Sequence, residues 1–114
     1  MTDGRLSIEA STDEGGSTLT LNGEVDPHTT EQLDAAVDGA LAADPRLVLD
    51  LGGVTFIDSA GLRSLIRAQR QAEEASGSLV LRSPRPSTLR VLEITGLTDE
   101  LTIEAAAEAD TNPG

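Results

Sequence analysis

The sequence predicts a single α/β domain with a mixed, mostly parallel sheet of about five strands and about three to four helices. Three observations favour this class. Apolar residues recur with period two in some segments and with helical spacing in others, in the order β-β-α-β-α-β-α-β. Single helices separate the later strands, which implies right-handed crossovers between parallel neighbours. A length of 114 residues, 38% of them apolar, suffices for one modest core.

Residues 5–25 are predicted to form a β-hairpin. Polar residues alternate with apolar or small ones on both arms, and the turn Asp13–Gly16 separates the arms. The alternating positions are Leu6, Ile8, Ala10, Leu19, Leu21 and Gly23. After the hairpin, Asp26 or Thr29 is a candidate cap for a helix whose first turn suits Pro27. One face of this helix carries apolar side chains at helical spacing, namely Leu33, Ala36, Val37, Ala40 and Leu41.

The second half begins with a nearly continuous apolar run over residues 47–51, as expected of a central parallel strand buried on both faces. Gly52-Gly53 indicates a bulge or a close backbone approach. A second helix is predicted from about Ser59 to Ala75, with Arg67 among the residues that face water. The remaining elements are a short buried strand over 79–81, a third helix near 87–94 that ends at Gly96, and an edge strand over 101–104. Residues 1–104 thus form the expected domain, and residues 105–114 an acidic, flexible tail.

Composition excludes several classes of function. Twenty acidic residues and eight basic ones give a net charge of −12, so phosphate backbones and anionic lipid surfaces should repel the chain. One Phe and no Tyr or Trp leave no surface on which bases could stack. The lack of Cys removes disulfides, thiolate metal sites and cysteine nucleophiles, and no apolar run is long enough to span a bilayer. We therefore expect a protein partner, with no direct contact to nucleic acid or membrane.

In parallel sheets, binding and catalytic residues usually lie in the loops that follow the carboxyl ends of the strands. Two predicted loops have this position, Glu24–Thr30 and the turn that contains Asp58 and Ser59. Ser59 stands where the free backbone N–H groups of a helix begin. Three interpretations of Ser59 are open: an ordinary helix cap, a catalytic nucleophile and a phosphoacceptor. A phosphate there would lie in the favourable field of the helix N-terminus, one turn from Arg63, which is otherwise a solvated surface residue.

A nucleophilic serine needs a base, and His28 is the only histidine in the chain. Ile57 stands where a nucleophile elbow has glycine, and no oxyanion-hole sequence is present, so a small serine hydrolase is disfavoured. Asp26 and Asp58 are loop or cap acids, or together an acidic rim beside Ser59. No phosphate-cradling loop accompanies them, so neither metal nor cofactor is expected. Gly61 indicates close packing of the first helical turn or close approach by a partner.

Four segments, taken together and in order, resemble the STAS domain family, in particular the small anti-sigma factor antagonists of bacteria. They are Leu21-Asn22-Gly23-Glu24-Val25-Asp26 with the Thr29/Thr30 helix start, Leu47–Leu51, Val54–Leu62 and Leu92–Leu97. The combination of Gly-Glu-x-Asp with Asp-Ser-x-Gly-Leu downstream is a fairly specific pair of motifs. Ala60 departs from relatives that carry Ser or Thr there, which leaves Ser59 as the only hydroxyl in that motif.

The resemblance implies a cytoplasmic protein without catalysis of its own. It would bind an anti-sigma factor that is also a serine kinase and thereby release a sigma factor. The kinase would phosphorylate Ser59, the complex would dissociate, and a metal-dependent serine phosphatase would restore the unmodified form. The expected partner-binding residues are Asp26, His28, Thr29, Asp58, Ser59, Ala60, Gly61, Leu62 and Arg63. The alternative is a STAS-like accessory subunit of a membrane lipid or anion transport system, with Ser59 as an unmodified contact.

Overall fold

The computed structural model describes residues 5–105 and confirms the predicted fold class and element order. The elements are β1 (Leu6–Asp13), β2 (Gly16–Val25), α1 (Thr30–Ala43), β3 (Arg46–Ile57), α2 (Ser59–Glu74), β4 (Ser78–Arg82), α3 (Pro86–Ile94), a 3-10 turn η1 (Leu97–Asp99) and β5 (Thr102–Glu104). The short turn η1 is an addition that the sequence pattern did not indicate. The predicted tail falls, from residue 106 onward, outside the described residues.

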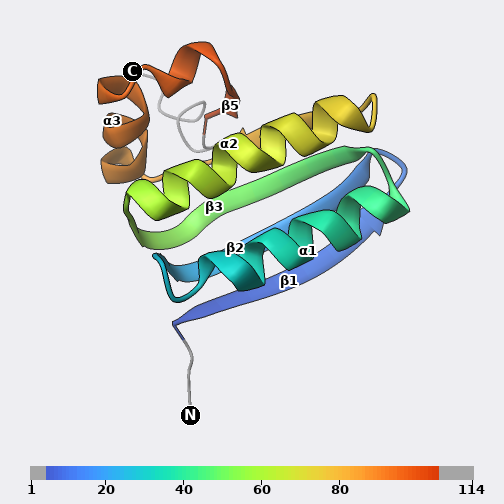
Figure 1. The fold of residues 1–114 in the computed structure, drawn as a ribbon, viewed down its shortest axis with the longest axis horizontal. Helices are drawn as coiled ribbons and strands as arrows, with labels where there is room; N and C mark the ends of the chain where they lie inside the picture. Colours follow the sequence, from blue (N-terminus) through green and yellow to red (C-terminus); the bar gives the residue numbers. More distant parts are fainter. Residues whose placement is uncertain (1–4, 106–114) are drawn as a thin grey trace, which may run out of the picture.

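The five strands form one sheet in the order β1-β2-β3-β4-β5. β1 and β2 pair antiparallel from Leu6 opposite Gly23 to Asp13 opposite Gly16, which confirms the predicted hairpin. The remaining neighbours pair parallel. Helices α1 and α2 run side by side over the sheet, with α1 along β1 and β2 and α2 along β3 and β4 (Figure 1). Helix α3 lies near the N-terminal end of α2 and contacts the carboxyl end of β3 (Figure 1).

The expectation that β3 is buried on both faces is wrong. Leu47, Leu49 and Leu51 are buried, whereas Val48 and Asp50 between them are only half-buried. The chain moves across the sheet in one direction from β2 to β4, so two right-handed crossovers place α1 and α2 over the same face. Val48 is therefore an apolar residue that is only half-buried. Its presence between two leucines made the segment resemble a strand that is buried on both faces.

The core is aliphatic, as the composition predicted. Its largest fully buried side chains are leucines and valines from the sheet and from both covering helices. They are Leu19, Leu21, Leu33, Leu47, Leu49, Leu51, Leu65, Leu81, Leu92, Val25, Val37 and Val54. The one aromatic residue of the chain, Phe56, is 49% exposed and belongs to the surface.

Glycines set the local geometry of β3. The register between β2 and β3 shifts after Thr20 and again after Gly23, which confirms the predicted irregularity at Gly52-Gly53. A Cβ on Gly53 would lie 2.9 Å from the backbone carbonyl oxygen of Leu21 and would also displace the side chain of Asn22, so glycine allows the two strands to come this close. Because β3 continues past the shift to Ile57, its carboxyl end lies beside that of β2. Among residues 5–105, no helix is both long and apolar enough to cross a bilayer.

Candidate functional site

Ser59 is the first residue of α2, separated from the carboxyl end of β3 by Asp58 alone, and it is exposed. The cap of α2 is Asp58, whose carboxylate Oδ1 accepts a hydrogen bond of 3.1 Å from the backbone N–H of Gly61. The interpretation of Ser59 as an N-cap is therefore wrong. An aspartate one position earlier takes that role because its charge also complements the helix dipole. Within the described residues, the Ser59 hydroxyl forms no hydrogen bond, so the fold does not depend on it.

Gly61 and Leu62 fix the first turn of α2 against the sheet. A Cβ on Gly61 would lie 2.6 Å from Ile57 Cγ1 and 2.9 Å from Val25 Cγ1, too close for any other residue. This confirms the predicted close packing. Leu62 is buried in the core cluster. Both residues were predicted to contact the partner, but the domain itself covers them. In a complex they would act by holding Ser59 and Ala60 in place.

The loop after β2 is closed by its own hydrogen bonds. Asp26 is 7% exposed, and its Oδ1 accepts from the backbone N–H of His28 at 2.9 Å. The hydroxyl of Thr29, which is 4% exposed, accepts from the Asp26 N–H at 3.0 Å and donates to the Glu24 carbonyl at 2.9 Å. Arg5 Nη1 lies 3.4 Å from Asp26 Oδ2.

These bonds change the expected roles of the loop residues. Thr29 occupies the N-cap position of α1, but its side chain forms no cap hydrogen bond, and Asp26 does not cap the helix either. Helix α1 begins at Thr30, so Pro27 lies in the preceding turn and not in the first helical turn. Asp26 and Thr29 shape the loop from inside, and His28 is the member of the predicted set that the loop exposes.

The two predicted loops meet, as expected for neighbouring parallel strands. A hollow of about 520 Å³ lies where the starts of α1 and α2 face each other. It is lined by Pro27, Thr30 and Asp34 on one side and by Ala60, Arg63, Ser64 and Arg67 on the other. Two of the predicted partner-binding residues, Ala60 and Arg63, therefore line the hollow, and Ser59 is the immediate neighbour of Ala60. The surface is large enough to receive a side chain of a partner.

Arg67 is partly exposed, as expected, and it also joins the two helices. Its Nη2 donates to Asp38 Oδ2 at 2.9 Å, and its Nη1 lies 3.9 Å from Asp34 Oδ1. The hydrogen bond to Asp38 raises the pKa of Arg67, and the charges of Asp38 and Asp34 add to it. Asp34 Oδ1 and Arg67 Nη1 are both buried without a hydrogen-bond partner. The sequence contained one indication of this contact, because Asp34 and Asp38 stand four residues apart on the same side of α1. It did not indicate that Arg67 would be their partner, since Arg67 is 29 residues away from Asp38 along the chain.

The geometry gives no support to the two other chemistries considered for these residues, a nucleophilic serine with His28 as its base and a metal site formed by the acids. In the described part of the chain, no hydrogen bond connects Ser59 with His28, and no three His, Cys, Asp or Glu side chains gather as a metal site would require. The His28 contact that the loop does make uses its backbone N–H, not its ring. The turn therefore presents an exposed hydroxyl next to a polar hollow, without an assembled base.

Comparisons with known proteins place this arrangement in a family. Residues 8–104 match a family model described as Mlab, STAS domain. BtrV of Bordetella bronchiseptica, provisionally named an anti-sigma factor antagonist, is 34% identical over 90 residues, 78% of either chain. The crystal structure of an anti-sigma factor antagonist from Mycobacterium paratuberculosis gives a TM-score of 0.80 at 26% identity, covering 91% of this chain and 89% of the other.

Bacillus SpoIIAA, an anti-sigma factor antagonist, shares the fold in two states. Its unphosphorylated form gives a TM-score of 0.73 at 24% identity over 90% of this chain and 92% of the other. Its phosphorylated form gives 0.68 at 23% identity over 92% and 97%. The family match contains all predicted site residues, from Asp26 to Arg63. The chain belongs to the STAS domain family, and its relatives there include anti-sigma factor antagonists.

Proposed function

We propose that this protein is an anti-sigma factor antagonist whose partner binding is switched by phosphorylation of Ser59. In the cytoplasm, the unmodified form binds an anti-sigma factor that is also a serine kinase, and a sigma factor is released. A serine phosphatase removes the phosphate and restores binding. The observation that carries the proposal is the exposed, uncommitted hydroxyl of Ser59 at the start of α2, beside the hollow between α1 and α2.

The position of Ser59 makes it a suitable phosphoacceptor. An exposed hydroxyl can enter the active site of a kinase without unfolding the domain, and Leu62 and Gly61 hold the turn rigid behind it. A phosphate adds about −1.5 to −2 charges, which the N–H groups at the start of α2 tolerate. Arg63, one turn further along the same helix, is exposed and within the spacing at which side chains pair. The modified domain is therefore expected to keep its fold.

The effect on binding is expected to be local. A partner that covers Ser59 and the hollow must remove the new dianion from water beside Asp58, which already carries a negative charge. Weakening the complex about a thousandfold requires about 4 kcal/mol, and an imperfectly paired buried charge supplies a penalty of that size. No large conformational change is needed. The occurrence of this fold in both states of SpoIIAA is consistent with such a mechanism.

The test combines intact mass with capture. The full chain is incubated with ATP and a candidate anti-sigma factor kinase, and we expect the gain of one phosphate, lost in Ser59→Ala. Ser87→Ala is the matched control, because Ser87 is also an exposed serine in the first turn of a helix. The unmodified chain should capture the kinase, and the phosphorylated chain should not. Phosphate that persists in Ser59→Ala would overturn the assignment, and stable capture of a membrane transport ATPase or transporter instead would favour the transport-subunit alternative.

A further inference from the structure

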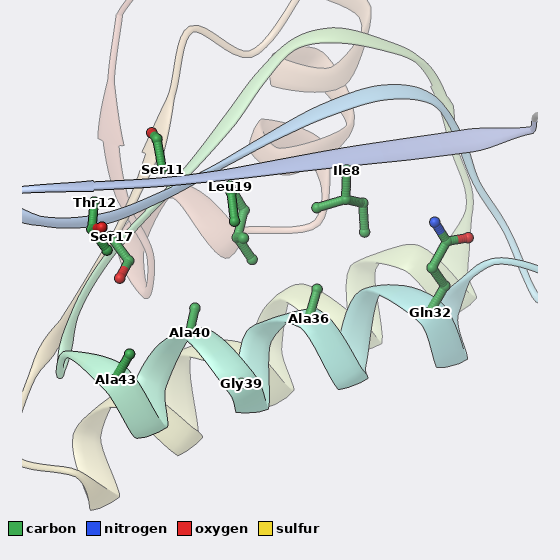
Figure 2. A pocket seen from close by; sticks show the side chains of 11 residues that line it. Ile8, Ser11, Thr12, Ser17, Leu19, Gln32, Ala36, Gly39, Ala40 and Ala43 are labelled. Atoms are coloured by element: carbon green, nitrogen blue, oxygen red, sulfur yellow. The ribbon is translucent and has the colours of Figure 1, made fainter.

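A second hollow lies away from Ser59, between the hairpin and α1. It has a volume of about 540 Å³ and lies beneath the β1–β2 hairpin. Its walls are mainly Ile8, Ala10 and Leu19 from the strands and Ala36, Gly39 and Ala40 from the helix. Figure 2 shows the alanines pointing from α1 toward the strands, with Ile8 and Leu19 pointing back toward the helix. Because α1 offers only small side chains here, the helix and the hairpin leave an apolar groove between them.

Ser17 makes this groove unusual. Its side chain is 3% exposed, it lines the groove, and its Oγ has no hydrogen-bond partner. In Figure 2 the hydroxyl of Ser17 points from β2 into the space above α1, near Ala43. A buried hydroxyl without a partner is costly, and alanine would avoid that cost at this position. The unpaired group thus points to a ligand that supplies the missing acceptor.

The groove is long and closed at one end by a polar side chain. Its helical wall runs from Gln32 to Ala43, which at 1.5 Å per residue spans about 16 Å. Gln32 donates from Nε2 to the Leu6 carbonyl at 3.0 Å and so fixes that end. An extended chain advances about 1.2 Å per bond, so about a dozen bonded carbon atoms would fill the length. The shape fits one unbranched apolar chain.

The charges near the Ser17 end of the groove indicate whether the polar head of such a ligand is neutral or charged. None of the residues that line the groove is charged. Asp13 lies at the hairpin turn opposite Gly16, and Arg46, packed against Gly16, donates to both carboxylate oxygens of Asp44. An anionic head would therefore find no cation among the residues that line the groove, in a chain of net charge −12.

We propose that this groove binds an uncharged amphiphile, whose unbranched apolar chain lies along α1 and whose neutral oxygen accepts a hydrogen bond from Ser17 Oγ. An alcohol, an ester or an amide supplies such an oxygen. The ligand is taken up as a single molecule from solution, since the acidic surface disfavours approach to an anionic bilayer. This binding site is separate from the hollow beside Ser59 and independent of phosphorylation.

The test is a titration of the full chain with 1-decanol below its solubility limit, followed by isothermal calorimetry and by backbone amide NMR. We expect saturable binding of one molecule, with shifts at Ser17 and along the groove side of α1. Ionised decanoate at neutral pH should bind at least about tenfold more weakly. Absence of saturable binding, or shifts confined to the hollow beside Ser59, would overturn the proposal, and equal affinity for decanoate would overturn the neutral head.

Three variants and one control test the geometry. Ala40→Met fills the groove and should abolish decanol binding, whereas Ala35→Met, on the exposed side of the same helix, should leave it unchanged. Ala36→Met is a second filling variant in case Ala40→Met fails to fold. Ser17→Ala should weaken decanol binding about threefold to tenfold without lowering the melting temperature of the free protein. Wild-type affinity in a folded filling variant, or in Ser17→Ala, would contradict the site.

Discussion

The two turns at the carboxyl ends of β2 and β3 both begin with an aspartate, but they differ in which polar side chains they leave exposed. Each turn leads into a helix. Asp26 is buried, and its backbone and carboxylate are occupied by His28, Thr29 and Arg5. In the turn after β3, the Asp58 side chain accepts a hydrogen bond from the Gly61 N–H, and the chain then enters α2 at once and leaves Ser59 exposed.

The difference lies in where each turn places its hydroxyl. Thr29 follows three loop residues, and its buried hydroxyl accepts a hydrogen bond from the Asp26 N–H and donates one to the Glu24 carbonyl. Ser59 follows its aspartate directly, and its hydroxyl is not needed for the turn. The first turn thus serves as a scaffold for the hollow between the helices, and the second presents the exposed hydroxyl of Ser59. Substitutions in the two turns should accordingly affect different measurements.

The largest expected effect is on partner binding at Ser59. Phosphorylation should raise the dissociation constant of the partner complex about a thousandfold, and Ser59→Asp, an imperfect mimic, at least about tenfold. The free energy of unfolding should stay within about 0.5 kcal/mol of wild type, because Ser59 is exposed. Calorimetric titration of the partner measures the first quantity and urea denaturation the second. Affinity of Ser59→Asp within about twofold of wild type would argue against a local charge mechanism.

Next in size is the scaffold aspartate. Asp26→Ala leaves the partners of a buried carboxylate unsatisfied and should lower the free energy of unfolding by about 2 kcal/mol. Asp58→Ala removes a single helix cap and should cost about 1 kcal/mol. Urea denaturation of both variants measures the difference. The opposite ranking would mean that the turn after β3, and not the turn after β2, is the scaffold.

Two helical glycines give a matched pair. Gly61→Ala should destabilise the domain by about 1–2 kcal/mol, because its Cβ would press on Ile57 and Val25. Gly39→Ala on α1 meets nothing within 4 Å and should stabilise it by about 0.5–1 kcal/mol through helix propensity. Thermal unfolding should therefore shift in opposite directions. A stabilising Gly61→Ala would show that the first turn of α2 is not packed against the sheet.

The smallest effect concerns the two arginines of the hollow. Arg67→Met breaks the contact with Asp38 and should cost about 0.5 kcal/mol, since its side chain is 39% exposed and the pair is screened. The cost should shrink in high salt. Arg63→Met should leave stability unchanged but weaken partner binding severalfold as a contact at the rim of the hollow. Equal partner affinity in Arg63→Met and wild type would remove Arg63 from the proposed binding surface.

Much of the fold could be predicted from the pattern of the chain. The period-two hairpin, the helical spacing on α1 and the Ser59 start of α2 each depend on neighbours in sequence, and the structure confirms them. The errors concern properties that need the third dimension. The prediction that β3 is buried on both faces was wrong because Val48 is apolar on an uncovered face. The contact between Arg67 and Asp38 was missed because the two residues lie on different helices.

The candidate site divides in the same way. Asp58-Ser59 and the loop at Asp26 could be predicted because each follows a strand. The sequence did not indicate which of the two aspartates would be buried. The roles of the predicted partner-binding residues remain predictions. Sequence spacing could not choose between Asp58 and Ser59 as the cap of α2, because both can accept a hydrogen bond and only the path of the backbone decides.

The sequence alone determined the element order, the aliphatic core, the acidic surface and the hydroxyl of the Asp-Ser-x-Gly motif, since each depends on composition or on short spacings. Tertiary structure decided which carboxylate is enclosed, that Arg67 joins α1 to α2, and that the small residues of α1 leave a groove beside an unpaired Ser17. The physical reason is that burial and pairing depend on groups brought together from distant parts of the chain, and no local pattern records that distance.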